Sequence, residues 1–231
     1  MLFRSLFQKL NEKAKPPFAA FVQIDDKYLL SSSPERFLKR MGNQLISQPI
    51  KGTARRHTDQ THDAEEAFQL QRSEKERAEN TMIVDLVRND MSRIATKGSV
   101  EVKELCKVYP FVHVHQMIST VVAELQAETP VADAIAACFP MGSMTGAPKV
   151  RAMQLIEQYE ETKRGLYSGA VGYIDPNGDF DFNVVIRSLI YRKDTEYLSL
   201  QVGSALTANS NPVKERSEEH TSELQSPDHL V

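Results

Sequence analysis

The sequence has few of the features that would assign it to a membrane, nucleic-acid-binding or disulfide-stabilised class. Its 231 residues contain only two cysteines and carry a formal net charge of −3. No apolar run approaches the roughly 18 residues that a membrane span requires. Without a surplus of basic residues there is no electrostatic field to attract nucleic acid. Cys106 and Cys138 lie too far apart for a metal motif, so buried reduced thiols are expected.

The first residues are too few and too polar for a secretory signal, so a cytoplasmic protein is the default expectation. The composition, 41% hydrophobic and 26% charged, is ordinary for a globular protein. A chain of this length can bury one sizeable core or form two interlocked subdomains.

Hydrophobic periodicity predicts an α+β protein. The first meander consists of three strand-like runs, at residues 18–25, 27–33 and 43–50. One long helix is predicted over residues 63–89. A second meander over residues 164–206 has its turns at 175–179 and 192–196. The predicted architecture is therefore two related antiparallel β-sheets packed together, with helices outside.

Two glutamates of the predicted long helix stand on an apolar stripe. Glu76 and Glu79 share a face with Ile83 and Leu86, at spacings i, i+3, i+7 and i+10. Two ionised carboxylates that face a core are costly unless they are paired or bound to a metal. A hard-cation site is one interpretation, because Mg²⁺ takes oxygen ligands. The alternative is that the stripe ends there and the pair points to water.

Three further stretches leave a choice between a structural and a binding role. The loop Gly142–Gly146 precedes a helix start, whose free N–H groups bind anions, but a plain helix cap is the alternative. Arg187 lies inside a strand-like run, as a solvated edge residue or as a clamp for a carboxylate. Lys51, in "PIKGT", is either a solvated side chain at a strand end or a residue directed at a substrate.

Together these stretches resemble the chorismate-utilising enzymes, the family of anthranilate synthase, aminodeoxychorismate synthase component I, and the isochorismate and salicylate synthases. The segments that carry the resemblance follow in family order: SPERFL, PIKGT, KERAENTMIVDLVRND, GSMTGAPKVRAM, RGLYSGAVGYI and NVVIRS. The resemblance implies the family's α+β fold. It also implies a reaction that removes the 4-hydroxyl of chorismate and delivers a nucleophile to the ring.

The resemblance implies a role for each residue at a motif position. Glutamates would hold Mg²⁺ on the ring carboxylate, at Glu76 and Glu79, and Glu215 and Glu218 have the spacing of the family's further metal-facing glutamates. Glu35 matches the general acid for the departing hydroxyl. The implied substrate-binding residues are Gly52, Thr53, Gly142, Ser143, Tyr167, Arg187 and Gly203.

The lysine at position 51 resembles the residue that the amination branch of the family carries at this motif position. That branch carries lysine in "KGT", where anthranilate synthase and its isomerase relatives typically carry alanine. The resemblance implies that Lys51 attacks C2 and expels the 4-hydroxyl, after which ammonia adds at C4. The implied product is 4-amino-4-deoxychorismate, for para-aminobenzoate and folate synthesis, with ammonia from a glutamine amidotransferase subunit. Anthranilate synthase component I and an inactive chorismate-binding fragment are the alternatives.

Three departures from the family pattern stand out. Gln116 replaces the usual histidine, Ala205 replaces the second glycine of a pair, and Arg216 replaces an aromatic residue. Residues 216–231 are polar and lack apolar periodicity, so a non-family tail is expected after a partial catalytic domain at residues 1–215. The resemblance also implies that the family's N-terminal subdomain is missing, so the fold is expected to be incomplete at both ends.

Overall fold

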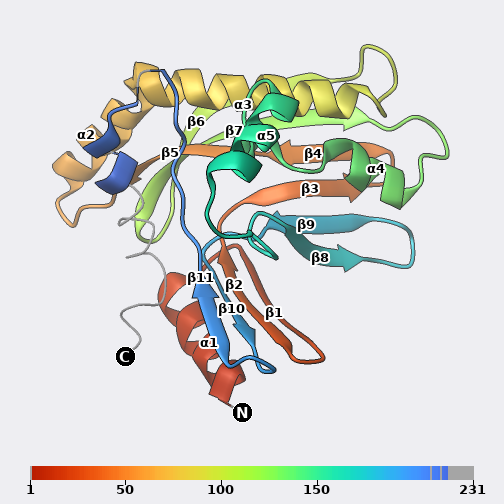
Figure 1. Cartoon of the computed structure of the whole chain (residues 1–231). Coiled ribbons are helices and arrows are strands. Elements are labelled where there is room, and N and C mark those ends of the chain that lie inside the picture. The colour runs from red at the N-terminus through yellow and green to blue at the C-terminus, as the bar shows by residue number, and fades with distance from the viewer. Residues whose placement is uncertain (1, 209, 214, 218–231) are drawn as a thin grey trace. The chain divides into compact units, whose positions relative to one another are not determined.

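A computed structural model describes residues 2–208, 210–213 and 215–217 of the chain (Figure 1). The helices are α1 (Leu2–Ala14), α2 (Gln60–Arg72), α3 (Glu74–Ser92), α4 (Val131–Cys138), the 3₁₀ helix η1 (Gly142–Met144) and α5 (Lys149–Tyr159). The strands are β1 (Phe18–Ile24), β2 (Lys27–Ser33), β3 (Arg36–Met41), β4 (Gln44–Gln48), β5 (Ile50–Arg55), β6 (Glu101–Pro110), β7 (Val114–Glu124), β8 (Ala170–Ile174), β9 (Phe180–Val184), β10 (Ser188–Arg192) and β11 (Tyr197–Leu200). None of the described helices is both long enough and apolar enough to cross a membrane.

The chain forms two compact units. Unit 1 comprises the described residues of Met1–Pro34, Arg164–Val171 and Asn183–Val231. Unit 2 comprises Glu35–Lys163 and Gly172–Phe182.

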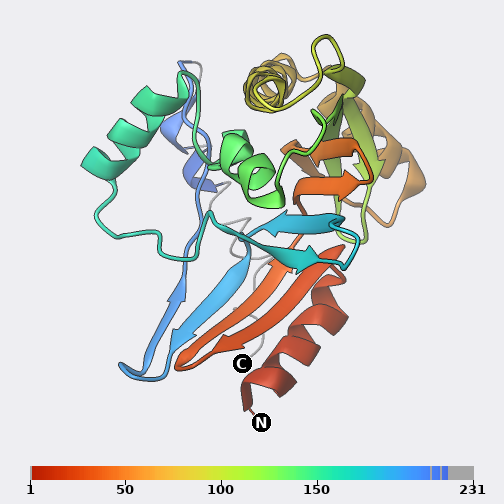
Figure 2. The same cartoon turned by 90° about the vertical axis from the view of Figure 1, so that its right-hand side faces the viewer.

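Unit 1 contains a four-stranded antiparallel sheet in the order β1-β2-β10-β11, with α1 packed along it (Figure 2). The apolar residues of α1 gather on one face, and Leu10 on that face packs against Leu30 of β2 and Leu189 of β10. Pairing of β2 with β10 sets Ser31 opposite Ser188, and the Ser188 hydroxyl donates to Ser31 Oγ at 2.9 Å. The sheet thus joins an N-terminal hairpin to a C-terminal one.

Unit 2 is built around β7, a long central strand of the seven-stranded sheet. One edge of β7 pairs with β6, and the other edge pairs in succession with β5 and β4. Helix α3 lies across this part of the sheet (Figure 1), and its residues Ile83, Val84 and Val87 are buried. Met117 and Val121 of β7 are fully buried as well. The packing of α3 on β5, β6 and β7 positions most of the candidate site.

The single helix predicted over residues 63–89 is in fact two helices. They meet at Ser73, which ends α2 and also caps α3, because its hydroxyl accepts a hydrogen bond from the Glu76 N–H at 3.3 Å. The apolar period continues on both sides of Ser73, so periodicity alone could not locate the break.

The predicted pairing of the two meanders is wrong. β4, from the third run, pairs with β3 and β7 instead of joining β1 and β2. The second meander also divides, since β8–β9 joins the seven-stranded sheet and β10–β11 the four-stranded one. Arg187 is not inside a strand but has φ +50° between β9 and β10. The turns at 175–179 and 192–196 are present, and the α+β class with two antiparallel sheets is confirmed.

Candidate functional site

Lys51 lies in a β-bulge of β5. The register between β5 and β7 pairs Ile50 with Ile118 and Thr53 with Gln116. Between these two pairs β5 therefore contains one residue more than β7, which defines a bulge. Lys51 is half-buried there, whereas Thr53 is exposed. The bulge takes Lys51 out of the regular alternation of side chains along the strand.

Gly52 brings β5 into contact with α3. It has φ +92°, a conformation that residues with a side chain rarely adopt. A Cβ at this position would lie only 3.1 Å from both Cβ and Oε2 of Glu76. Glycine is therefore required for its conformation and for the close approach, and the Glu76 carboxylate lies against the backbone that follows Lys51.

The carboxylates of Glu76 and Glu79 both lie near the ammonium of Lys75. Lys75 Nζ lies 3.7 Å from Glu76 Oε1 and 3.8 Å from Glu79 Oε1. Glu79 is only 5% exposed, so the alternative that both carboxylates point to water is wrong. The first turns of α3 thus hold two carboxylates beside the Lys75 ammonium.

This arrangement fits a hard divalent cation. Mg²⁺ is usually bound through one or two carboxylates, while water and substrate oxygens complete its six ligands. Glu76 and Glu79 supply two carboxylates that already converge on a positive charge. Within the described ranges, no group of three or more His, Cys, Asp or Glu residues could hold a metal by itself. The chain thus offers the partial ligand set that suits a metal shared with a substrate.

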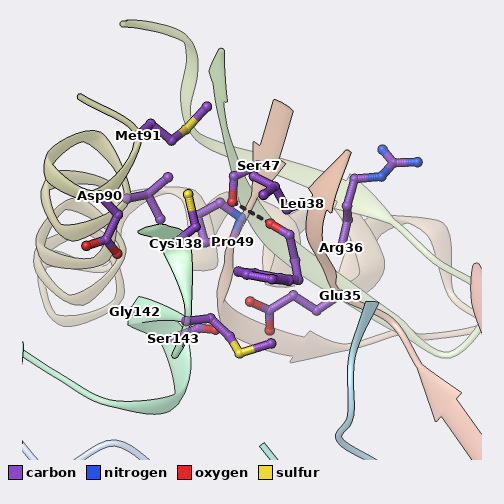
Figure 3. Close-up of a pocket in the computed structure, with 13 residues that line it drawn as sticks. Glu35, Arg36, Leu38, Ser47, Pro49, Asp90, Met91, Cys138, Gly142 and Ser143 are labelled. Carbon is purple, nitrogen blue, oxygen red and sulfur yellow. Dashed lines mark hydrogen bonds between the residues drawn. The ribbon is translucent and has the colours of Figure 1, made fainter. Parts of the chain in front are cut away.

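Glu35 and the chain after α4 line one pocket of unit 2 (Figure 3). Glu35 directly precedes β3, is 5% exposed, and directs its carboxylate toward the segment of Gly142 and Ser143. The Ser143 hydroxyl is buried and has no hydrogen-bond partner among the described residues. A carboxyl group and an unsatisfied hydroxyl at one pocket can orient a polar ligand. Most of the remaining lining is apolar: Phe37, Leu38, Pro49, Val87, Met91, Cys138 and Met141.

Lys149 links the two ends of the pocket loop, residues 140–148, because it directly follows the loop and its side chain bonds to Pro140, where the loop begins. The Lys149 ammonium donates to Asp90 Oδ2 of α3 at 2.5 Å and to the carbonyl of Pro140 at 2.6 Å. The side chains of Lys149 and Asp90 are only 14% and 4% exposed. Burial raises the pKa of Asp90, while the hydrogen bond and charge of Lys149 lower it. Burial, with the nearby charge of Asp90, also raises the pKa of Cys138 to about 12.

In unit 1 the structure brings Tyr167 and Gly203 together. A Cβ on Gly203 would lie 3.2 Å from the Tyr167 hydroxyl, so glycine leaves room for the phenol. The guanidinium of Arg164 lies 5.9 Å from the centroid of the Tyr167 ring. The carbonyl of Arg187 accepts a hydrogen bond from the Ser32 N–H at 3.1 Å. Binding of a substrate carboxylate by Tyr167 and Arg187 stays a prediction.

Glu215 is buried, with 3% of its surface exposed, and accepts a hydrogen bond from the Ser204 hydroxyl. Its N–H donates to the carbonyl of Asn211 at 3.0 Å. Residues 212, 213 and 215–217 are helical. The other predicted metal ligand of this segment, Glu218, lies outside the described residues, and the boundary predicted at residue 215 stays a prediction.

Two buried polar residues of α3, Asn80 and Asp90, were not predicted from the sequence. Both lie on the face that carries Ile83 and Val87, at steps of three and four residues along the chain. A polar residue recurring in an apolar stripe was the available signal, and the same signal had already identified Glu79.

The sequence is similar to proteins of known family. A profile of the chorismate binding enzyme family matches residues 3–221. The chain is 43% identical over 212 residues to aminodeoxychorismate synthase component 1 of Klebsiella aerogenes, covering 92% of this chain and 47% of that protein. It is 40% identical over 210 residues to anthranilate synthase component 1 of Bacillus pumilus, covering 91% of this chain and 40% of that protein. The chain spans about half the length, or less, of the curated relatives it matches.

The fold also matches a solved structure. Anthranilate synthase component I from Streptococcus pneumoniae TIGR4 superposes with a TM-score of 0.84 at 30% sequence identity. The match covers 98% of this chain and 49% of that one.

Proposed function

The chain belongs to the chorismate binding enzyme family, and we propose that it aminates chorismate at C4. The product would be 4-amino-4-deoxychorismate, used for para-aminobenzoate and folate synthesis. The relatives named aminodeoxychorismate synthase component 1 support this branch of the family. Their designation as component 1 supports a second component, which we propose is a glutamine amidotransferase that supplies ammonia.

The observation that carries the proposal is the position of Lys51 beside the carboxylate pair of α3. Gly52, the next residue, lies against Glu76, so the lysine backbone and the candidate cation site adjoin one another. A cation held by Glu76 and Glu79 would attract the ring carboxylate of chorismate. Because that carboxylate is carried on C1, a lysine next to its binding site is well placed to reach C2.

In the proposed mechanism Lys51 acts as the nucleophile. The lone pair of its neutral amine forms a bond to C2, the conjugated ring double bonds carry the displaced electron pair to C4, and the C4–O bond breaks. Glu35 gives a proton to the departing hydroxyl, which leaves as water. Ammonia then bonds to C4, the electron pair returns through the ring, and the C2–N bond breaks to release Lys51.

The remaining residues of unit 2 bind and orient the substrate in this proposal. Mg²⁺, when bound, would neutralise the ring carboxylate and hold it in place. Glu76 and Glu79 would hold the metal, with Lys75 as their counter-charge in its absence. The buried Ser143 hydroxyl would donate a hydrogen bond at the pocket that contains Glu35, and the apolar lining of this pocket would exclude water.

A second candidate function is that of anthranilate synthase component I, which the relative from Bacillus pumilus supports. That reaction adds ammonia at C2, the position that a lysine adduct would block. Lys51 therefore favours amination at C4.

The test measures whether Lys51 becomes covalently modified. We expect intact-protein mass spectrometry of the enzyme with chorismate and Mg²⁺, but no ammonia, to show an adduct on Lys51. Lys51→Arg keeps the charge but not the nucleophilicity, so it should show no adduct and lose at least about a hundredfold in amination rate. Lys51→Ala should lose the C2 block and give some product substituted at C2.

The control for both variants is chorismate binding, measured by calorimetry, which should change little. An unmodified Lys51 together with an active Lys51→Arg enzyme would refute the nucleophilic role. Binding of chorismate without turnover by any form would instead indicate an inactive chorismate-binding fragment.

A further inference from the structure

Asn80 is a buried side chain of α3 that the mechanism above does not use. It is 1% exposed and lies one helical turn after Glu76, on the side of α3 that packs against the sheet. A buried amide is costly unless its donors and acceptor are satisfied. The partners of Asn80 therefore show what it holds in place.

The bulge in β5 leaves two backbone groups that need a partner. Because β5 has one extra residue opposite β7, the regular ladder is interrupted between the pairs Ile50–Ile118 and Thr53–Gln116. Lys51 lies in this interval on β5, and Met117 lies in it on β7. The Met117 carbonyl is buried and the Lys51 carbonyl is partly buried, and an unpaired backbone oxygen in such surroundings is unfavourable.

The side-chain amide of Asn80 supplies hydrogen bonds to both carbonyls. Nδ2 donates to the Lys51 carbonyl at 3.4 Å and to the Met117 carbonyl at 3.2 Å. An amide nitrogen has two hydrogens, so one side chain can serve both strands. Asn80 thereby bridges the bulge where the ladder is interrupted.

The orientation of this amide is fixed from its other end. Asn80 Oδ1 accepts a hydrogen bond from the hydroxyl of Ser119, which is 0% exposed. Ser119 Oγ in turn accepts the Cys106 N–H at 2.8 Å. A flipped amide would set Oδ1 against two carbonyl oxygens and lose the bond from Ser119, so the network selects a single orientation.

From these contacts we infer that Asn80 is a positioning residue for Lys51. Its amide holds the bulge in the form that presents the lysine beside Glu76 and Glu79, and it acts through the backbone without touching the substrate. This role rests on the proposed function of Lys51. Because Asn80 acts on the geometry of attack, its loss should lower kcat much more than it raises KM.

The test compares Asn80→Ala with Thr81→Ala, a matched change one residue along the same helix. Thr81 has no hydrogen bond to Lys51 and contacts Cys106 Sγ at 3.9 Å. We expect Asn80→Ala to slow both kcat and the formation of the Lys51 adduct by about tenfold or more, with KM for chorismate within about threefold. Thr81→Ala should leave both rates within about twofold of the wild type.

Hydrogen exchange provides a readout that does not depend on catalysis. Without substrate, the amides of residues 50–53 should exchange faster in Asn80→Ala than in Thr81→Ala, because the bulge loses its bridge. Should Asn80→Ala fail to fold, Ser119→Ala carries the same test, because it removes the hydrogen bond that orients the amide, together with the acceptor of the Cys106 N–H. It should lower kcat by about threefold or more with KM unchanged.

Adduct formation within about twofold of the wild type in a folded Asn80→Ala, or in Ser119→Ala if the former does not fold, would overturn the positioning role. Failure of the proposed function looks different, because the wild type itself would then form no adduct. In that case amide exchange at residues 50–53 decides. Faster exchange in Asn80→Ala than in Thr81→Ala supports the conclusion that Asn80 stabilises the bulge, and equal exchange overturns it.

Discussion

Replacing Lys149 by methionine should destabilise unit 2 in a pH-dependent manner. The change keeps most of the side-chain volume but removes the ammonium that bonds to Asp90 and to the Pro140 carbonyl. Removing one partner of a buried ion pair typically costs about 3–5 kcal/mol. Arg93, whose guanidinium lies 3.6 Å from Asp90, remains as a partial counter-charge. We therefore expect a loss of about 3 kcal/mol in the free energy of unfolding at about pH 8.

The direction of the pH dependence follows from the pKa of Asp90. Burial raises that pKa in the folded state. Protonated Asp90 therefore favours folding below its unfolded pKa of about 4, and this contribution is lost as the pH rises through the folded pKa. Lys149 lowers the pKa of Asp90, and its removal raises the pKa further. In the variant, Asp90 can then become neutral by protonation in mild acid. The loss in the free energy of unfolding relative to the wild type should therefore shrink to about 1–2 kcal/mol near pH 5.

Urea denaturation at several pH values measures this deficit. Circular dichroism is a suitable signal, because the chain has no tryptophan. Lys163→Met is the control, since the ion pair between Lys163 and Glu157 is 81% and 71% exposed and should contribute less than about 1 kcal/mol. The double variant Asp90→Asn, Lys149→Met should recover part of the loss. A deficit that is the same at every pH, or that matches the control, would refute the reasoning.

Three further predictions concern charge and burial elsewhere in unit 2. Glu79→Gln should weaken Mg²⁺ binding about tenfold or more in a calorimetric titration, whereas Glu74→Gln, at an exposed position of the same helix, should not; equal affinities would contradict the metal site. Cys138, whose pKa burial raises to about 12, should react with iodoacetamide at about pH 8 no faster than the protein unfolds, and rapid labelling of the folded protein would contradict this. The hydrogen bond from Arg56 is the largest of the effects that lower the pKa of Asp63, so Asp63 stabilises the fold above its unfolded pKa near 4 and loses this contribution as the pH falls toward its folded pKa. Thermal melts should show Asp63→Asn less stable than the wild type at neutral pH, with the gap closing in acid; a constant gap would contradict the assignment.

Local patterns in the sequence predicted the local structure well. The turns at residues 175–179 and 192–196 were predicted because Pro, Asn, Gly and Asp favour turn conformations whatever surrounds them. Glu79 was identified because a carboxylate in an apolar stripe implies a buried charge. Both arguments need only neighbours along the chain.

Pairing between distant strands could not be predicted in the same way. The choice of β10 as the partner of β2 depends on tertiary packing, and the residues of β2 do not by themselves select one partner strand. The bulge at Lys51 leaves no mark on periodicity, because it is defined by the register with β7. The role of Asn80 follows from that register, so it became visible only when the two strands and α3 were placed together.

The pairing of β2 with β10 also has a consequence for how the protein is made. Ser31 and Ser188, which bond across these strands, are separated by 157 positions in the chain. At about 5–20 residues per second, a ribosome needs about 8–30 s to travel from one to the other. During this time the β1–β2 hairpin has an open strand edge at β2, where Leu29 and Leu30 later pair with Ile190 and Leu189 of β10. We therefore expect nascent chains released before β10 to aggregate or to be bound by chaperones, and expression at reduced translation speed to prolong this exposure.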